Sequence, residues 1–544
     1  MKYLILLLLP FSIYSQVKQS PKLVVGIVVD QMCYDYLYRF ESKYGKDGLL
    51  KLRDGGTNCR NTNYNYVPTY TGPGHASIYT GTTPATHGIV ANDWYDKDLG
   101  REKNCVEDTT VSTIGSGSTQ GKCSPHNLKA FTITDQLKLN RNGSKVISTS
   151  IKNRGSILPG GHLSDGSFWY DYTTGDFISS SFFMNELPAW VSEFNKNSYP
   201  EDQTKGVWDT YYPLANYTES AGDDRKYEHV LPGKERPVFP YDLGAMVQKS
   251  GISPFELFTS TPYANTYLTD FAISAINNEQ LGKDEITDML CISYSTPDII
   301  GHAFGPYSVE IEDTYIRLDR EIARLIHTLE KTVGKNNFVL FLTADHAVVP
   351  VPQFLADQNL PGGYFFVDTA MTDLEKYCVE RFGQDFIVEQ SNLNVYLDRE
   401  MITNEDLSVE EVAAALCEKL REYPEVRDAY TAAELSRGDQ ANRWMKMVSK
   451  GYHKEESGDL IFILEPGYLP KSHPSETTHQ GTSHGSAYSY DSHVPLLWYG
   501  AGIKKKQVLR PTEITDISAT LTHIMELQQP SNIEGQPILE LFEK

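Results

Sequence analysis

A hydroxyl residue stands directly before a Gly-Pro-Gly turn in residues 67–83, VPTYTGPGHASIYTGTT. The apolar residues Ala76, Ile78 and Tyr79 indicate a helix, so Thr71 is predicted to lie where a loop enters a helix N-terminus. Free N–H groups and the positive end of the helix dipole favour an anion there. The stretch therefore predicts a phosphoryl group facing the Thr71 hydroxyl, with ordinary turn chemistry as the alternative.

Carboxylates and imidazoles stand next to four apolar runs that are typical of strands buried on both faces. The runs are residues 22–29, 288–295, 337–343 and 494–499. The flanking side chains are Asp30, Asp298, His302, Asp345, His346 and His484. Ligands of open α/β sheets bind at the carboxyl ends of strands, so we expect these six to meet. Singly each is an ordinary turn or surface residue, but together they suit two zinc ions with open positions.

Amphipathic helical patterns alternate with the apolar runs, which predicts an α/β fold. The helical patterns lie at residues 36–53, 131–139, 267–277, 309–331 and 514–525, and a fifth strand-like run is residues 145–151. Buried strands separated by such helices predict an α/β/α sandwich with a largely parallel central sheet.

Three polar segments interrupt this alternation: residues 96–124, 199–250 and about 351–474. The third lies between Asp345-His346 and His484, so we expect an inserted cap or lid beside the site. The predicted organisation is a catalytic domain of residues 16–350 and 475–544, with residues 351–474 as the cap.

The chain of 544 residues has a net charge of −22, which argues against nucleic acid or an anionic membrane as main partner. A small anionic substrate stays compatible if metal ions or local cations set the field in the cleft. Residues 1–15 resemble a cleaved signal peptide, with an uncleaved anchor as the alternative, so export to the periplasm or the medium is expected. No later stretch predicts stable membrane insertion, and we expect a monomer.

The seven cysteines are scattered and contain no CxxC spacing, which argues against a zinc ribbon. Export permits disulfides, so Cys105–Cys123 and Cys378–Cys417 are candidate pairs. Buried free thiols are the alternative.

Several motifs occur in an order that resembles the alkaline phosphatase superfamily, most closely its phosphate-irrepressible (PafA-type) branch. They are VVDQM, VPTYTGPGH, THGIVANDWYD, SIKNRGSILPGGH, STPDIIGHAFGP, TADHA and SHGSAYSYDSHVPLLWYG. The resemblance covers nearly all of the mature chain and implies an alkaline-phosphatase-like fold. It also implies an exported, zinc-dependent alkaline phosphatase that hydrolyses phosphate monoesters through a covalent phosphothreonine.

The resemblance assigns roles residue by residue. It implies that Thr71 is the nucleophile and that two zinc ions are held by Asp30, Asp345 and His346, with the Thr71 alkoxide, and by Asp298, His302 and His484. Asn92 matches a donor to a phosphoryl oxygen, and Lys152 with Arg154 matches the cationic pair of the monoesterase branch. Their i, i+2 spacing would point both side chains to one side of an extended chain.

Other histidines compete for these roles. His479 is the alternative to His484 in THQGTSHG. We choose His484 because His484-Gly485, followed by Tyr490-Asp491 and the strand-like run VPLLWY, reproduces the family's order. His75 and His87 are interpreted as structural, and the role of His162 is open.

Rival functions use the same scaffold or lose its chemistry. A phosphodiesterase or phosphonate hydrolase is the first alternative, against which Lys152 and Arg154 argue. A non-catalytic binding protein, a sulfatase and a membrane-bound phosphoethanolamine transferase are further alternatives. The full set of metal ligands argues against the binding protein, and Thr71 at the nucleophile position argues against the sulfatase. The missing transmembrane helices argue against the transferase.

Overall fold

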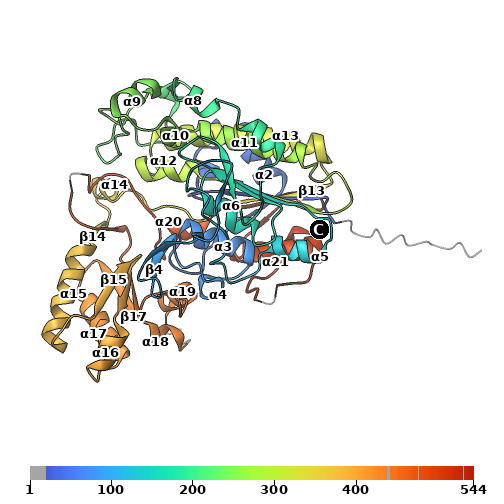
Figure 1. The fold of residues 1–544 in the computed structure, drawn as a ribbon. Helices are drawn as coiled ribbons and strands as arrows, with labels where there is room; N and C mark the ends of the chain where they lie inside the picture. Colours follow the sequence, from blue (N-terminus) through green and yellow to red (C-terminus); the bar gives the residue numbers. More distant parts are fainter. Residues whose placement is uncertain (1–19, 438–441, 476, 531, 544) are drawn as a thin grey trace, which may run out of the picture.

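A large mixed sheet forms the centre of the molecule (Figure 1). The computed structural model describes residues 20–437, 442–475, 477–530 and 532–543, so the signal-peptide prediction lies outside the described residues. In these residues the sheet has ten strands. Their order is β22 (Lys506–Val508), β2 (Thr57–Cys59), β21 (Leu496–Gly500), β13 (Phe338–Thr343), β1 (Leu23–Val29), β12 (Asp288–Tyr294), β7 (Val146–Ser150), β8 (Gly166–Tyr170), β9 (Phe177–Ser180) and β6 (Thr113–Ile114).

The middle of the sheet is parallel. β1 pairs in parallel with β12 and β13, and β7 continues the parallel array from β12 to β8. Every residue of β1 is buried, as its continuous valine-rich sequence predicts for a strand covered on both faces. Antiparallel strands β21 and β9 flank this centre. The predicted largely parallel sheet is confirmed.

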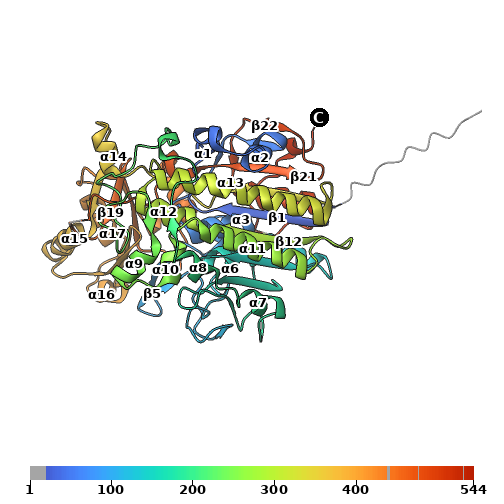
Figure 2. The same cartoon turned by 90° about the horizontal axis from the view of Figure 1, so that it is seen from above.

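Helices cover both faces of the sheet, which confirms the α/β/α sandwich. α11 (Tyr263–Asn278) and α13 (Val309–Leu329) pack on one face. α3 (Thr71–Thr80), α5 (Ile133–Asn140) and α21 (Asp516–Met525) pack on the other (Figures 1 and 2).

The helix expected at residues 36–53 is wrong as a single element. The chain instead forms α1 (Tyr36–Arg39), a 3-10 helix (Glu41–Lys43), a loop and α2 (Leu49–Gly55). The Asp319 carboxylate on α13 accepts hydrogen bonds from the backbone N–H groups of Gly45 and Leu49, each at 2.7 Å. This long-range contact satisfies donors in the break between the helices, so the pattern of apolar residues continues while the helix does not.

The chain between β13 and β21 builds a second hydrophobic core, outside the main sheet (Figure 1, orange). In the described residues a four-stranded antiparallel sheet is ordered β15 (Ile387–Ser391), β16 (Asn394–Leu397), β18 (Leu460–Leu464), β17 (Val426–Thr431). Helices α15 (Val367–Phe382) and α17 (Val409–Leu420) pack against this sheet. We call residues 351–474 of this region the cap.

All seven cysteines are buried free thiols, so neither candidate disulfide is present. Among the described helices, none combines the length and the apolar character needed to cross a membrane.

Candidate active site

The predicted ligands gather at one edge of the central sheet because of how their strands run. Asp30 follows β1, and Asp345 and His346 follow β13. Asp298 and His302 lie one turn apart on α12 (Thr296–Phe304), directly after β12. β21 is antiparallel to β13, so the segment before it, with His484, lies at this same edge.

At this edge of the sheet, two groups of three side chains place their ligand atoms within 4.8 Å of one another. One group is Asp30, Asp345 and His346, and the other is Asp298, His346 and His484. His346 therefore belongs to both. His302 lies outside both groups, although its Nε2 is 3.1 Å from Asp298 Oδ1.

Each of the three histidines is oriented by its Nδ1 atom. His346 Nδ1 lies 2.9 Å from the Ala347 carbonyl oxygen. His302 Nδ1 lies 2.8 Å from the Thr482 carbonyl oxygen, and His484 Nδ1 lies 2.7 Å from the Thr69 carbonyl oxygen. Because a carbonyl only accepts, Nδ1 donates in each case, and in the neutral ring Nε2 keeps its lone pair for a metal ion. This is the orientation of metal-binding imidazoles.

The carboxylates also suit a divalent cation. Asp30 Oδ1 and Asp345 Oδ2 are buried and accept no hydrogen bond within the described residues. A buried carboxylate oxygen without a donor is costly unless a cation meets it. The donor set of oxygens and imidazole nitrogens therefore fits the predicted metal sites.

Thr71 is the first residue of α3, with its side chain buried. Its Oγ1 lies 3.4 Å from Nε2 of His346, the residue that both ligand groups share. The structure thus brings the predicted nucleophile to the predicted metal ligands.

Two of the N–H groups expected to be free at this helix N-terminus have partners within the chain. The Gly72 N–H donates to Asn92 Oδ1 at 2.7 Å, and the Gly74 N–H donates to the Tyr70 carbonyl at 2.8 Å. A Cβ on Gly74 would lie 2.3 Å from the Asp345 carbonyl oxygen, so this glycine permits close packing of α3 rather than approach of a ligand. Because Asn92 Oδ1 accepts from Gly72, its amide nitrogen is left to donate elsewhere.

Lys152 and Arg154 flank the ligand groups, but not along an extended chain. Lys152 is the N-cap residue of α6 (Asn153–Gly160), and Arg154 lies in the first turn of that helix, so the premise of the i, i+2 argument is wrong. Lys152 Nζ lies 2.6 Å from Asp30 Oδ2 and also pairs with Asp298 Oδ2. Among the described residues the Arg154 guanidinium has no protein partner, and its Nε is buried.

Charge compensation shifts the pKa values in the site. Burial raises the pKa of Asp298, but His302 and Lys152 overcome this effect and hold it well below the usual value. Burial lowers the pKa of His346, yet Asp345 and Asp30 raise it to about 9. Burial and the neighbouring carboxylates Asp298 and Asp345 raise the pKa of Asp30.

The histidines left out of the predicted site lie elsewhere or behind it. His479 is exposed and its ring contacts Tyr364, whereas His484 is buried among the ligands. His75 Nδ1 lies 2.8 Å from the Thr71 carbonyl and 3.3 Å from Asp345 Oδ2, behind the site. Burial lowers the pKa of His87 to about 3, which fits a neutral structural residue.

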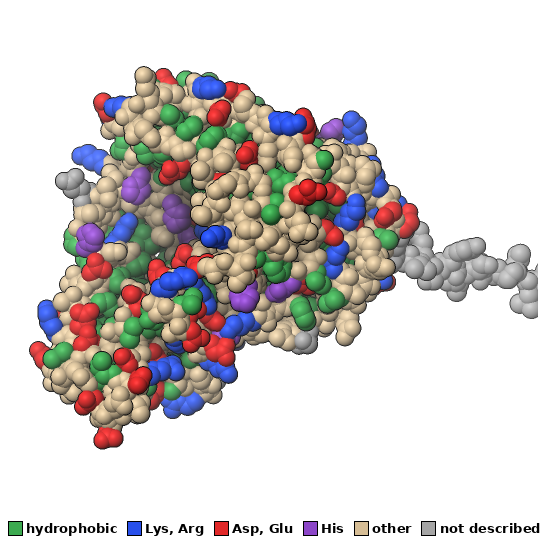
Figure 3. Space-filling view, viewed as in Figure 1, with side chains coloured by type: hydrophobic (Ala, Val, Ile, Leu, Met, Phe, Trp, Pro, Cys, Tyr) green, Lys and Arg blue, Asp and Glu red, His purple; other side chains and the backbone are tan. Residues whose placement is uncertain are grey.

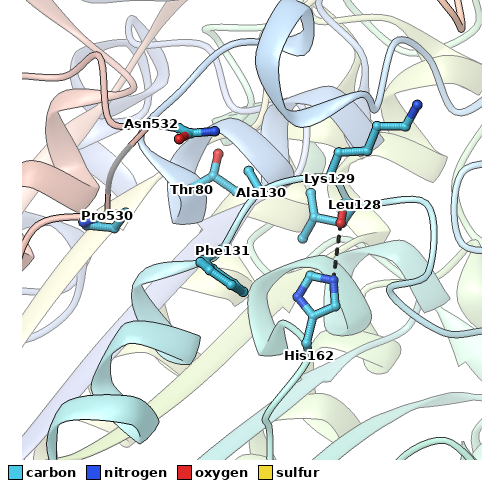
Figure 4. A pocket seen from close by; sticks show the side chains of 8 residues that line it. All are labelled: Thr80, Leu128, Lys129, Ala130, Phe131, His162, Pro530 and Asn532. Carbon is cyan, nitrogen blue, oxygen red and sulfur yellow. Dashed lines mark hydrogen bonds between the residues drawn. The ribbon is translucent and has the colours of Figure 1, made fainter.

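His162 lines a separate cavity of about 210 Å³ (Figure 4). Its Nδ1 lies 3.0 Å from Asp135 Oδ2 and its Nε2 lies 3.1 Å from the Leu128 carbonyl. Thr80, at the C-terminal end of α3, lines the same cavity. The cavity therefore lies at the opposite end of α3 from Thr71.

An apolar cleft opens beside His484, between the cap and the part of the chain that builds the main sheet, which we call the body. Its walls include Tyr70 and His484 from the body, and Leu393, Ile463 and Tyr468 from the cap. Histidine side chains are visible in the recess between these two parts in Figure 3. The cap thus borders the route to the ligand groups.

Sequence reasoning missed Gln31, which is buried between the two ligand groups. Its side-chain amide donates to Asp298 Oδ1 at 2.5 Å, and its backbone N–H donates to Asp345 Oδ1 at 3.3 Å. Its place in the VVDQM motif, directly after Asp30, was the sequence signal for it.

Comparison with known sequences gives a consistent family. The model for type I phosphodiesterase / nucleotide pyrophosphatase matches residues 24–487. Alkaline phosphatase PafA of Elizabethkingia meningoseptica is 41% identical over 527 residues, covering 96% of this chain and 94% of that protein. Alkaline phosphatase PhoV of Synechococcus elongatus is 39% identical, covering 98% and 94%.

Solved structures agree with the sequence matches. The crystal structure of wild-type PafA has a TM-score of 0.91 at 40% identity, covering 96% of this chain and 99% of that chain. Murine ectonucleotide pyrophosphatase / phosphodiesterase 5 has a TM-score of 0.53 at 15% identity over 96% of this chain and all of that one, and shares the fold alone. The chain belongs to the type I phosphodiesterase / nucleotide pyrophosphatase family, within the alkaline phosphatase superfamily.

Proposed function

We propose that this protein is a zinc-dependent alkaline phosphatase that hydrolyses phosphate monoesters through a covalent phosphothreonine at Thr71. The observation that carries the proposal is the buried Thr71 hydroxyl 3.4 Å from Nε2 of His346, the residue common to both ligand groups. A hydroxyl so placed is positioned for activation as a nucleophile.

Two groups of side chains would hold the ions: Asp30, Asp345 and His346 for one, and Asp298, His302 and His484 for the other. Bound zinc would supply Lewis-acid stabilisation of the reacting oxygens and ionise a hydroxyl near neutral pH. The geometry equally supports an arrangement in which His346 lies between the two ions, because His346 belongs to both ligand groups.

The side chains of the chain itself account for substrate binding and bond exchange. Thr71 Oγ1 forms a bond to phosphorus while the ester P–O bond breaks, and the alcohol leaves with a proton. Water then attacks the phosphothreonine, which releases inorganic phosphate and restores the Thr71 hydroxyl.

Three donors are available for the phosphoryl oxygens that do not react. Arg154 has no protein partner in the described chain, and the amide nitrogen of Asn92 is turned away from Gly72. Lys152 contributes a buried positive charge next to them. A monoester dianion offers one more charged oxygen than a diester, so these donors favour the monoester.

The relatives support the same choice. PafA and PhoV are named alkaline phosphatases. A further PafA structure, with a TM-score of 0.90 at 39% identity, is of a variant in which a threonine, an asparagine, a lysine and an arginine are replaced. Those residue types and their order match Thr71, Asn92, Lys152 and Arg154.

The alternative function is a phosphodiesterase or phosphonate hydrolase. The family model carries the phosphodiesterase name, and a phosphonoacetate hydrolase shares the fold at a TM-score of 0.51. The ratio of kcat/KM for an aryl phosphate monoester to that for a matched diester decides between them. We expect a large monoester preference that a chelator abolishes, whereas a diester preference would reassign the enzyme.

The nucleophile is tested by Thr71→Ala, with Thr71→Ser as the matched control. We expect Thr71→Ala to lower kcat by about 10³-fold or more while both zinc ions stay bound, because only the attacking oxygen is removed. Thr71→Ser should retain turnover and give a phosphorylated serine by mass spectrometry. Near-normal turnover by Thr71→Ala would refute the covalent mechanism.

Further assignments complete the proposal. The chain would act as an exported monomer, in the periplasm or the medium, on small phosphate monoesters. Residues 16–350 and 475–544 would form the catalytic domain, and residues 351–474 the cap. Mass spectrometry of the exported protein would locate the new N-terminus near residue 16.

A further inference from the structure

Gln31 breaks a backbone rule at the centre of the site. Its φ is 67°, in the left-handed region that residues other than glycine, asparagine and aspartate seldom adopt. The side chain is 2% exposed, so no contact with solvent explains this conformation. Strain of this kind persists where surrounding structure holds the residue for a purpose.

A second broken rule lies opposite the first. Gly301 stands inside α12, where glycine is a poor helix former. A Cβ at this position would lie 1.9 Å from Gln31 Oε1, and its next two neighbours are also atoms of the Gln31 amide. Both irregular choices, the left-handed Gln31 and the helical Gly301, therefore serve one contact.

The contact joins the two ligand groups. The Gln31 amide reaches Asp298 in one group, and the Gln31 backbone N–H reaches Asp345 in the other. Asp298 Oδ1 also faces His302, while Asp298 Oδ2 faces Lys152. The hydrogen bond from the Gln31 amide thus fixes the orientation of the Asp298 carboxylate. In this orientation Oδ1 faces His302 and Oδ2 faces Lys152.

We infer that Gln31 is a positioning residue that orients Asp298 for metal binding and fixes the spacing of the two ligand groups, with Gly301 as its required neighbour. The inference rests on the proposed zinc sites. Removing a partner that orients a metal ligand lowers metal affinity by about 10- to 100-fold. We expect a loss of that size in one of the two zinc ions of the full chain.

The experiment is a cycle of variants at the two positions, with zinc affinity measured by competition against a chelating dye. Gln31→Met keeps the length of the side chain but cannot donate, so it should lower the affinity for one ion by about 10- to 100-fold. Gly301→Ala should do the same, because its Cβ displaces the amide. Asparagine tolerates the left-handed backbone, but its side chain is too short to reach Asp298. Gln31→Asn should therefore lower zinc affinity as Gln31→Met does.

The double variant separates positioning from general damage. In the Gln31→Gly background Gly301→Ala meets no amide, so it should leave zinc affinity unchanged and raise the Tm of the chelated protein. In the wild-type background the same substitution should lower both. Equal effects of Gly301→Ala in the two backgrounds would overturn the inference.

The outcomes also distinguish this inference from the proposed function. A wild-type chain that binds two zinc ions, with unchanged affinity in Gln31→Met and Gly301→Ala, would overturn the role of Gln31 alone. A wild-type chain that binds no zinc would overturn both.

Discussion

Two groups of carboxylates, one that includes Asp298 of α12 and one that includes Glu310 of α13, have their charges balanced in opposite ways. In the candidate active site, Lys152 pairs with both Asp30 and Asp298, and His302 approaches Asp298. These cations outweigh the effect of burial on Asp298 and hold its pKa well below the usual value. Asp298 and Asp345 are therefore held ionised, whereas burial and the neighbouring carboxylates raise the pKa of Asp30.

The second group consists of Asp223, Glu228 and Glu310. Each carboxylate accepts one hydrogen bond on one oxygen, from the Phe239 N–H, the Arg225 N–H and the Tyr241 hydroxyl respectively. The other oxygen of each is buried without a partner, and none of the three forms an ion pair in the described part of the chain. Lys234 is close enough to interact with Asp223 and Glu310, but burial lowers its pKa.

Without paired cations the second group holds protons. Burial and the Glu310 carboxylate raise the pKa of Glu228 to about 9, and burial raises the pKa of Glu310 to about 8 although the Tyr241 hydroxyl opposes it. The difference shows that a buried carboxylate stays ionised only where a paired cation outweighs the effect of burial on its pKa. A cation that pairs with two carboxylates, as Lys152 does, distinguishes the candidate active site from the second group.

The largest effect is expected from Lys152→Met, which removes that cation. Breaking a buried pair leaves uncompensated charge, so the unfolding free energy of the chelated protein should fall by about 3–5 kcal/mol. The pKa of Lys152 is raised by Asp298 and Asp30 against the effect of burial, so this stabilisation is present below 10.5, the ordinary lysine pKa. Urea unfolding at pH 8 in a chelator measures it.

Arg154→Met is the matched control for this change. Its guanidinium has no protein partner among the described residues, so stability should change by less than about 1 kcal/mol. Both variants should slow hydrolysis of an aryl phosphate monoester, by about 10²-fold. Equal losses of stability in the two variants would contradict the contrast between a paired and an unpaired cation.

A smaller effect of opposite sign is expected from Glu310→Gln. The pKa of Glu310 is raised in the folded state to about 8 from 4.5, so the folded state binds more protons between these pH values. Wild-type stability therefore falls as pH rises through this window, and the glutamine removes that loss. The variant should gain about 2–4 kcal/mol relative to wild type between pH 5 and pH 9.

Thermal unfolding across this pH range measures the gain, and the exposed Glu186→Gln serves as control. Glu186 is exposed, so its substitution should show no comparable pH trend. A Glu310→Gln variant that is less stable than wild type at pH 9 would mean that Glu310 is ionised and compensated, as Asp298 is.

Local pattern and strand direction were enough to predict the central sheet and the carboxylates at its edge. Continuous apolar runs such as β1 and β13 revealed the buried sheet, and the polar residues after them revealed Asp30 and Asp345. Parallel strands end at one edge of the sheet, so their order alone predicts that these carboxylates meet.

The features that the sequence could not predict depend on long-range partners. The helix expected at residues 36–53 breaks where Asp319, far along the chain, accepts the Gly45 and Leu49 N–H groups. Gln31 gained its role from Gly301 and Asp298, which no periodicity connects to it. The second carboxylate group was missed for the same reason, because Glu228 lies in a polar loop and Glu310 at the start of an amphipathic helix.

The smallest expected effect is that of Tyr241→Phe, which tests how the second group tolerates charge. The Tyr241 hydroxyl donates to Glu310 Oε1 at 2.6 Å, and this bond favours the ionised carboxylate. Its removal should cost about 1–3 kcal/mol and cost more at pH 9, where Glu310 is ionised, than at pH 5. In the Glu310→Gln background the loss should no longer depend on pH. If it still does, another titrating group, with Glu228 as the nearest candidate, sets the alkaline limit of this region.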